Sequence, residues 1–458
     1  MRYLPHTEEE IRQMLGVIGA RSVDDLFSTV PSTLREKAKL DVPPALDEVR
    51  LMRHLAELAG QNAGPDMLCF LGAGMYPHHI PPAVDQLLLR SEFYTAYTPY
   101  QPEVSQGTLQ AIWEFQTMVS ELYGLGLSNA SLYDGASAAA EGALMARRLT
   151  GRPRVLASRC VHPEYRATVA TYSAGQDSAS GPGEGNYSEV EASSRCGAAD
   201  QDAIDAALDD ATAAVLVGYP SFLGTFADLG PLAERVHARG ALLVVVNTEP
   251  YALALARSPG SLGADIVAGE GQALACPPQF GGPSLGLFAC RHERRYLQQL
   301  PGRVCGQTLD QNGESGYVLT LATREQHIRR ERATSNICTN QGLLALSFAI
   351  RTSLLGRQGF VAVARQCLAK AHYLESRIAS LSGYAPLVDG APFFNEFAVR
   401  VRGGDADAVC EKLERQGVIA GLALGRYDAA LRHGLLIAVT ETHSREDLDR
   451  LVALLDAA

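Results

Sequence analysis

Apolar residues near the start of the chain recur at a helical period. The segment 8–18 has this spacing, and Thr7 followed by Glu10 three residues later forms a capping-box sequence at its start. A second helix is expected over 46–58. Together these helices predict a polar N-terminal arm, residues 1–65, which is too small to have a core of its own.

From about residue 66 the pattern changes to short, continuously apolar runs that alternate with amphipathic segments. Strands are expected over 154–157, 213–218, 241–247, 264–268 and 284–289, and helices over 105–123, 164–172 and 229–239. Ser105 is the expected cap of the first of these helices. Continuously apolar strands between helices are typical of a largely parallel sheet covered on both faces. This predicts a large α/β domain over residues 66–330.

After residue 330 the pattern changes again. A helix is expected over 339–355, followed by strands at 396–401, 419–423 and 435–439 and helices at 405–415 and 445–455. The order of these elements predicts a small α+β domain over residues 331–458.

Composition narrows the function classes. The 458 residues are 47% hydrophobic and 20% charged, which is typical of a soluble globular protein of two or three domains. The net charge of −11 without a basic run argues against nucleic acid and an anionic membrane surface as partners. We expect no membrane span and no signal peptide. Nine cysteines without regular spacing favour reduced thiols in the cytoplasm.

Lysine is unusually rare. Only four of the 40 basic residues are lysines, namely Lys37, Lys39, Lys370 and Lys412. An arginine-preferring genome would produce the same scarcity. In either case, no side chain between Leu40 and Ala369 can form a Schiff base, which requires a primary amine.

Two conventional motifs are too weak to carry a function. Gly72-Ala73-Gly74 and Gly269-Glu270-Gly271 each lack the third glycine of a dinucleotide fingerprint. His78-His79 and Cys160-Val161-His162 are the best metal candidates, but neither has enough ligands nearby for a zinc site. We therefore expect ordinary buried or surface histidines and small core cysteines at both places.

Three other segments allow two interpretations each. Residues 134–141 form a small-residue helix start, which is either an anion site or a closely packed, capped helix. Residues 94–107 are rich in tyrosine and proline, which suits a shaped binding surface or a loop at a subunit contact. Residues 329–341 are first basic and then rich in hydroxyls and amides, which suits an anion site or a solvated face.

Four segments resemble the glycine cleavage system P-protein family, and within it the subunit 1 (α chain) of the two-subunit bacterial form. The segments are 3–7, 97–107, 129–141 and 324–339, and the resemblance extends over nearly the whole chain. It implies the fold of pyridoxal-phosphate-dependent transferases (fold type I, aspartate aminotransferase-like). The reaction that it implies is the decarboxylation of glycine, with transfer of the aminomethyl group to the lipoyl arm of the H-protein.

Two departures from the family's catalytic pattern set this chain apart. The strand that should end in an aspartate facing the pyridinium nitrogen ends in Asn247, which cannot supply a negative charge. Gln272 and Ala273 stand where the catalytic half of the family has His-Lys. The resemblance therefore implies that this chain binds no pyridoxal phosphate covalently and is inactive alone, and that subunit 2 (the β chain) holds the cofactor.

The resemblance also implies an α2β2 assembly whose sites lie at subunit interfaces. On this basis, residues of the tyrosine-rich loop and of the basic link are expected to line the glycine and lipoyl channel of the partner: Tyr97, Tyr100, Glu103, Gln106, Arg330, Ser335 and Asn336. Ser335 and Asn336 are the expected contacts of the phosphate or the glycine carboxylate. Two alternatives stay open, a purely structural or regulatory subunit and a stand-alone enzyme with noncovalent cofactor. Lys370 is a remote Schiff-base candidate.

Overall fold

The computed structural model describes residues 5–38, 41–62, 64, 67–174, 186–193, 197–279, 281–388 and 390–458. The chain divides into two compact units, Met1–Pro65 and Asp66–Ala458. Four residues named above lie outside the described residues: Tyr3 and Leu4 of the first family-like segment, Lys39 and Leu40.

The N-terminal unit consists of short helices with almost no interior. They are α1 (Glu8–Ile18), η1 (Val23–Phe27), α2 (Ser32–Lys37) and α3 (Glu48–Ala59). The predicted capping box starts α1: the Glu10 amide donates to Thr7 Oγ1 over 3.3 Å, and the Thr7 amide donates to Glu10 Oε2 over 2.7 Å. Leu15 is the one buried residue among the described residues of this unit. The arm therefore lacks a core of its own, as its sequence predicts.

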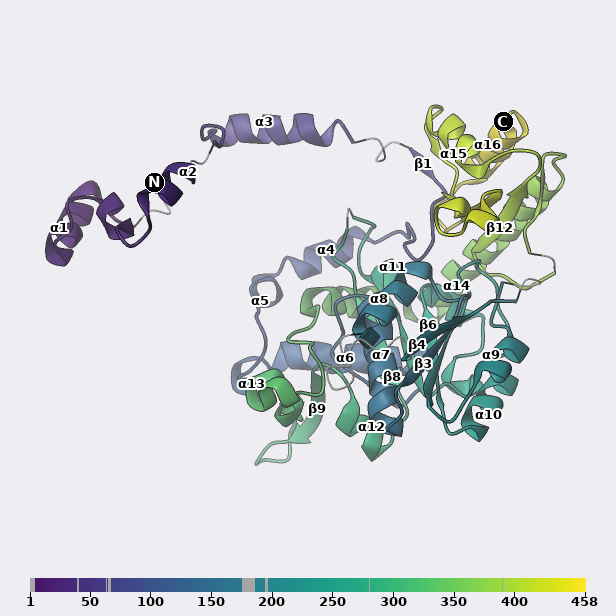
Figure 1. The fold of residues 1–458 in the computed structure, drawn as a ribbon, viewed down its shortest axis with the longest axis horizontal. Coiled ribbons are helices and arrows are strands. Elements are labelled where there is room, and N and C mark those ends of the chain that lie inside the picture. The colour runs from purple at the N-terminus through teal and green to yellow at the C-terminus, as the bar shows by residue number, and fades with distance from the viewer. Residues whose placement is uncertain are drawn as a thin grey trace. The chain divides into compact units, whose positions relative to one another are not determined.

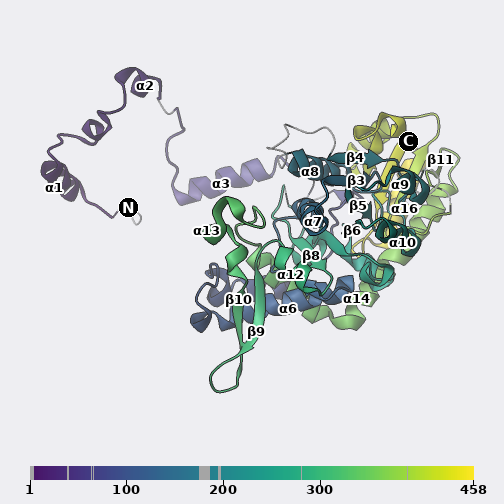
Figure 2. The same ribbon diagram turned by 60° about the horizontal axis from the view of Figure 1, so that its bottom comes forward.

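The second unit is built on a mixed seven-stranded sheet in the order β2-β8-β7-β6-β5-β3-β4 (Figures 1 and 2). The strands are β2 (Leu127–Ser128), β3 (Arg154–Ser158), β4 (Tyr187–Val190), β5 (Thr212–Gly218), β6 (Leu242–Asn247), β7 (Ile266–Glu270) and β8 (Gly286–Cys290). Strands β3 to β7 are parallel, whereas β8 pairs antiparallel with β7 and β2. The sequence thus predicts the parallel part correctly but not the reversal at β8.

Helices cover both faces of this sheet, with α7 on one side and α9 and α10 on the other (Figures 1 and 2). The helices of this region are α4 (Pro82–Leu88), α5 (Ser91–Tyr94), η2 (Pro102–Val104), α6 (Gln106–Tyr123), α7 (Gly135–Thr150), α8 (Pro163–Ala174), α9 (Gln201–Ala207), α10 (Gly230–Ala238), η3 (Pro250–Ala254), η4 (Gly260–Leu262), α11 (Gln272–Ala275) and α12 (Arg294–Gln299). Small residues let α7 approach the sheet closely, since a Cβ at Gly142 would lie 3.3 Å from a Val244 methyl. Ser105 precedes α6, but its side chain makes no capping hydrogen bond.

A hairpin that the sequence pattern did not predict projects from this unit (Figure 2). It pairs β9 (Val304–Leu309) antiparallel with β10 (Ser315–Thr320). Its turn is held by the Asp310 carboxylate, which accepts from the backbone N–H groups of Asn312 and Glu314, each over 2.8 Å. The hairpin is followed by η5 (Ala322–Arg324), α13 (Gln326–Arg329) and η6 (Arg330–Arg332).

The C-terminal part begins with α14 (Gly342–Ala379), which runs well past the expected end at residue 355 and kinks at Gly356, where φ is +56°. An antiparallel sheet in the order β11-β12-β15-β14 follows. The elements are β11 (Tyr384–Pro386), β12 (Glu396–Val401), α15 (Ala406–Glu414), β13 (Val418–Ile419), β14 (Leu422–Ala423), η7 (Leu424–Arg426), η8 (Ala429–Leu431), β15 (Gly434–Ala438) and α16 (Arg445–Asp456).

In place of the expected strand 419–423 there are two short strands, β13 and β14, separated by Ala420 and Gly421. A Cβ at Gly421 would lie 2.2 Å from the Leu436 carbonyl oxygen, so the chain approaches β15 closely at this point. Strand β13 instead pairs in parallel with β1 (Leu68–Cys69). The core that packs against the C-terminal sheet accordingly includes Phe70, which follows β1, and residues of α14 from Ala371 onwards. The domain division at residue 330 stays a prediction.

Candidate functional site

The carboxyl ends of the parallel strands β5, β6 and β7 lie at one edge of the sheet, which is where open α/β sheets bind ligands, and the start of α7 meets the end of β7. The cavity at the ends of β5 and β6 has a volume of about 10 Å³. This is room for one water molecule at most. It is lined by Gly74, Tyr76, His162, Gly218, Pro220, Phe222, Val246, Thr248 and Glu396.

The start of α7 is occupied by a carboxylate of the chain itself. Glu270 Oε2 accepts from the Gly135 N–H over 3.0 Å, and Oε1 accepts from Gln272 N over 3.0 Å and Leu285 N over 2.9 Å. In transferases of this fold such a turn holds the cofactor phosphate. Here the helix start is capped from within by Glu270 and by the Asp134 side chain, which supports the closely packed, capped helix; the anion site stays a prediction.

Two buried carboxyl groups flank this edge. Burial raises the pKa of Glu270 to about 7, against the opposing effect of the backbone N–H groups that bond to it. Burial also raises the pKa of Glu396 to about 7. Glu396 Oε1 accepts from Ala73 N over 2.6 Å, and its Oε2 accepts from the Tyr76 hydroxyl over 2.9 Å. Both carboxyl groups therefore already accept hydrogen bonds from groups of this chain.

The positions that depart from the family's cofactor chemistry bond in part to the chain itself, although Asn247 Oδ1 is buried and has no hydrogen-bond partner among the described residues. The buried Asn247 amide donates to the carbonyls of Tyr219 over 2.9 Å and Glu249 over 3.2 Å. Gln272 Oε1 accepts from Tyr76 N over 3.2 Å, and its Nε2 donates to the Cys276 carbonyl. No lysine among the described residues lines the cavity. The missing amine and the small cavity thus do not fit a pyridoxal phosphate bound covalently to this chain.

The Lys370 amine bonds to the backbone of this chain: its Nζ donates to the Glu441 carbonyl over 2.6 Å. Near it, the buried His78 ring bridges two carboxylates, with Nε2 at 3.0 Å from Glu249 Oε2 and Nδ1 at 2.6 Å from Glu441 Oε2. Burial lowers the pKa of His78, but the carboxylates outweigh this effect and raise it well above its usual value.

This bridge accounts for His78 without a metal ion. His78, Cys367 and Glu441 place possible ligand atoms within 4.8 Å of one another, but both ring nitrogens already bond to carboxylates. The bridge joins the segment after β1, the end of β6 and the loop after β15. Its role is therefore to fix these three segments to one another.

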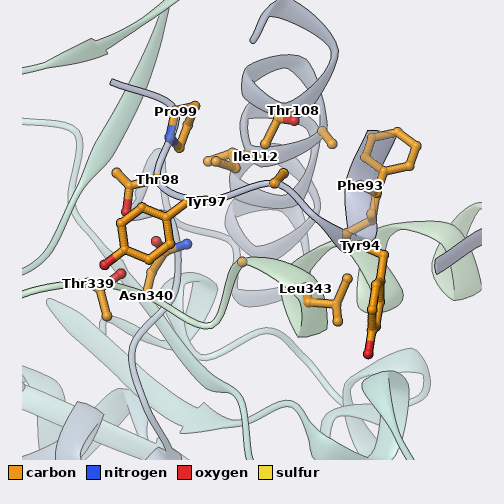
Figure 3. A pocket seen from close by; sticks show the side chains of 14 residues that line it. Phe93, Tyr94, Tyr97, Thr98, Pro99, Thr108, Ile112, Thr339, Asn340 and Leu343 are labelled. Atoms are coloured by element: carbon orange, nitrogen blue, oxygen red, sulfur yellow. The ribbon is translucent and has the colours of Figure 1, made fainter. Parts of the chain in front are cut away.

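The tyrosine-rich loop and the basic link, predicted to contribute to one site, lie side by side. They line a cavity of about 270 Å³ together with the face of α6 (Figure 3). The residues that line it are Phe93, Tyr94, Ala96, Tyr97, Thr98, Pro99, Thr108, Ala111, Ile112, Thr339, Asn340, Gly342, Leu343 and Leu346. Tyr97 is 84% exposed and lies beside Thr339 and Asn340.

The other predicted loop residues take different positions. Tyr100 is 59% exposed, and its hydroxyl accepts from Arg303 Nη2 over 2.9 Å. Glu103 is exposed in η2. Gln106 does not face the cavity: its amide donates to the carbonyl of Tyr317 and accepts from the N–H of the same residue, both over 2.9 Å, which attaches α6 to the hairpin.

The predicted link residues lie just before the cavity. Arg330 is exposed and has a left-handed backbone with φ of +53°. Ser335 Oγ accepts from Ile337 N over 3.0 Å, and Asn336 is exposed. Of the seven predicted residues, Tyr97 alone lines the cavity. The roles of all seven stay predictions.

Sequence reasoning missed Arg303, which lies between the two segments. Its side chain is buried and bonds to Tyr100 in the loop and to the Cys338 carbonyl in the link, both over 2.9 Å. A single arginine before a strand gives no signal of its own. The Pro301-Gly302 turn that precedes it is the one local feature that could have drawn attention to it.

Comparison with known proteins agrees with the resemblance seen in the sequence. The family model of the glycine cleavage system P-protein matches residues 1–455. A probable glycine dehydrogenase (decarboxylating) subunit 1 of Sorangium cellulosum is 60% identical, over 99% of this chain and 98% of the relative. A relative with the same description from Desulforamulus reducens is 49% identical over the full length of both chains.

Solved structures give the same result. The crystal structure of an inhibitor-bound glycine decarboxylase (P-protein) of the glycine cleavage system is 42% identical over the whole of both chains, with a TM-score of 0.88. A sphingosine-1-phosphate lyase of Burkholderia pseudomallei is similar in fold alone, at 17% identity and a TM-score of 0.64 over 92% of each chain. The predicted fold type I architecture is confirmed. Among the described residues, no helix is long and apolar enough to cross a membrane.

Proposed function

Because the chain belongs to the glycine cleavage system P-protein family, we propose that it works as subunit 1 of a decarboxylating glycine dehydrogenase. The partner, subunit 2, holds the pyridoxal phosphate, in an α2β2 assembly in the cytoplasm. The enzyme decarboxylates glycine and passes the aminomethyl group to the lipoyl arm of the H-protein. When bound, the cofactor supplies the electron sink for loss of CO2.

One observation supports this division of labour, namely that groups of the chain itself occupy part of the expected cofactor site. The Glu270 carboxylate takes the N–H at the start of α7, and the cavity at the strand ends has room for one water at most. Gln272 and Ala273 occupy the place of the expected His-Lys pair, and neither has an amine. A chain built in this way needs a second chain for the chemistry, which supports the pairing.

The N-terminal arm supports the same pairing. Within this unit, whose described residues bury only Leu15, several apolar side chains have no core to enter: Met14, Val17 and Ile18 on α1, and Val49, Leu51, Met52, Leu55 and Leu58 on α3. Helices with one apolar face and no core of their own gain stability by covering a neighbour. We assign that neighbour to subunit 2.

The loop and the link are this chain's contribution to the shared site. Tyr97 is exposed beside the cavity that both segments line, and Tyr100 presents its ring and hydroxyl at the surface. These tyrosines form a stiff wall that orients glycine and the lipoyl arm and excludes water from them. Ser335 and Asn336 supply polar contacts from the link to the glycine carboxylate or to the cofactor phosphate.

The test is co-expression with a candidate subunit 2, co-purification, and a glycine–bicarbonate exchange assay of each chain alone and of the complex. Exchange by the complex, with none by this chain, supports the proposal. Stable association without any effect of loop substitutions on exchange would favour a structural or regulatory subunit. Lack of association would refute the proposal, and exchange by this chain alone would favour the stand-alone enzyme.

A further inference from the structure

Arg303 is the point at which the tyrosine-rich loop and the link are joined. It lies directly before β9 and is 4% exposed. Both hydrogens of Nη2 are used, one by the Tyr100 hydroxyl and one by the Cys338 carbonyl, each over 2.9 Å. The guanidinium carbon is 5.1 Å from the centre of the Tyr100 ring, so the cation also contacts the aromatic face.

The remaining donors of Arg303 are left without acceptors. Nε and Nη1 are buried and make no hydrogen bond to any described residue. Glu325 Oε2 lies 3.7 Å from Nε, which balances the charge but is too far for a hydrogen bond. Buried donors without acceptors destabilise a fold, and natural proteins retain such arrangements mainly at functional sites. Stability alone therefore does not explain Arg303.

The bond between Arg303 and Tyr100 has only one possible direction. A guanidinium has donors and no acceptor, so the phenolic oxygen must accept. The phenolic proton is then free to be donated, and no described residue accepts it from Tyr100. Tyr100 is 59% exposed, so water or another group outside the chain can accept this proton.

We propose that Arg303 is a positioning residue that holds Tyr100 as an oriented hydrogen-bond donor to an anionic oxygen in the site shared with the partner subunit. The same guanidinium bonds to Cys338, so the donor is fixed relative to the link. The Cys338 and Thr339 N–H groups in turn donate to the Tyr133 hydroxyl over 3.0 and 3.3 Å, which attaches the link to the segment before α7. The inference rests on the proposed function.

The test uses the reconstituted two-subunit enzyme and four variants of this chain. Tyr100→Phe keeps the ring but removes the donor, and Arg303→Lys keeps the charge but removes the planar fork. Each is expected to lower kcat/KM for glycine exchange about tenfold, the effect of one oriented hydrogen bond to a charged group. The double variant is expected to lose no more than either single variant, because both remove the same interaction.

Arg295→Lys is the matched control. Arg295 also lies 5.1 Å from the centre of a tyrosine ring, that of Tyr296, but its side chain is 59% exposed and lies on α12. This variant is expected to keep wild-type exchange. Tyr100→Phe leaves one Nη2 hydrogen of the buried Arg303 without its acceptor, so thermal stability is expected to fall slightly, whereas the subunit ratio after co-purification is expected to stay unchanged.

Two results would support the inference and identify the acceptor. A higher KM for glycine at constant kcat assigns the anionic oxygen to the substrate carboxylate, and a lower kcat at constant KM assigns it to a group held by the partner. Wild-type kcat/KM in Tyr100→Phe would overturn the inference. So would a kcat/KM about a hundredfold below wild type in the double variant, since the two substitutions would then act independently. An inactive wild-type complex would instead refute the proposed function.

Discussion

Replacing Glu270 with glutamine is expected to remove part of the pH dependence of stability. The side chain is 3% exposed, and burial raises its pKa from 4.5 to about 7. Between these two values the folded carboxyl holds its proton, whereas the unfolded carboxyl has lost it. The folded state binds more protons in this window, so the stability due to Glu270 is fully present below pH 4.5 and is lost as the pH rises to about 7.

The size of the effect follows from the shift. A change from 4.5 to about 7 corresponds to about 3 kcal/mol of unfolding free energy, at roughly 1.4 kcal/mol per pKa unit. Glutamine has nearly the same shape but does not titrate. Its amide group places a donor against the Gly135 N–H, so the variant is expected to be less stable than wild type at pH 5 by about 1–3 kcal/mol. This deficit shrinks or reverses by pH 7.5.

Urea unfolding of wild type and Glu270→Gln at pH 5, 6, 7 and 7.5 measures the difference directly. It is expected to change by about 2 kcal/mol in favour of the variant across the series, because part of the full effect is already lost below pH 5. Glu234→Gln, at an exposed carboxylate on α10, is the control and should shift nothing with pH. A difference between Glu270→Gln and wild type that stays constant over the range would refute the reasoning.

Two further substitutions test other contacts. His78→Ala leaves the Glu249 and Glu441 carboxylates without their shared cation, so urea unfolding at pH 7 should show a loss of about 3–5 kcal/mol. Bonds to His78 lower the pKa of Glu441 to about 2 despite its burial, so wild type should itself lose stability as the pH falls from 4.5 towards 2. An unchanged midpoint for His78→Ala would contradict this reading of the bridge. Gln106→Ala removes both bonds to the Tyr317 backbone. Hydrogen exchange at the Tyr317 backbone N–H should therefore accelerate by about tenfold or more. Exchange at the wild-type rate would show that the Gln106 side chain does not hold the hairpin.

Local chemistry allowed much of the fold to be predicted from the sequence. Helix α1 begins and ends where its capping box and apolar period place it, at Glu8 and Ile18. The central strands are recognisable because they are buried on both faces. The β9–β10 hairpin was missed because β9 mixes polar and apolar residues without alternation, although Asp310 to Gly313 is a turn-type sequence.

The site was predictable only in part. The family-like segments predicted that the loop and the link contribute to one site, and residues of both segments, among them Tyr97, line one cavity; their role in the partner's site stays a prediction. Glu270 was missed because its three bonds come from Gly135, Gln272 and Leu285, which are far apart or unremarkable in the sequence. Such contacts follow from the folded chain and not from local spacing.

The central claim is that the partner subunit, and not this chain, holds the cofactor. Borohydride reduction of the pyridoxal-phosphate-loaded complex, followed by separation of the two chains and intact-mass measurement, tests this claim most directly. The account predicts one phosphopyridoxyl adduct on subunit 2 and none on this chain. An adduct on this chain, at Lys370 or at any of its other lysines, would contradict it.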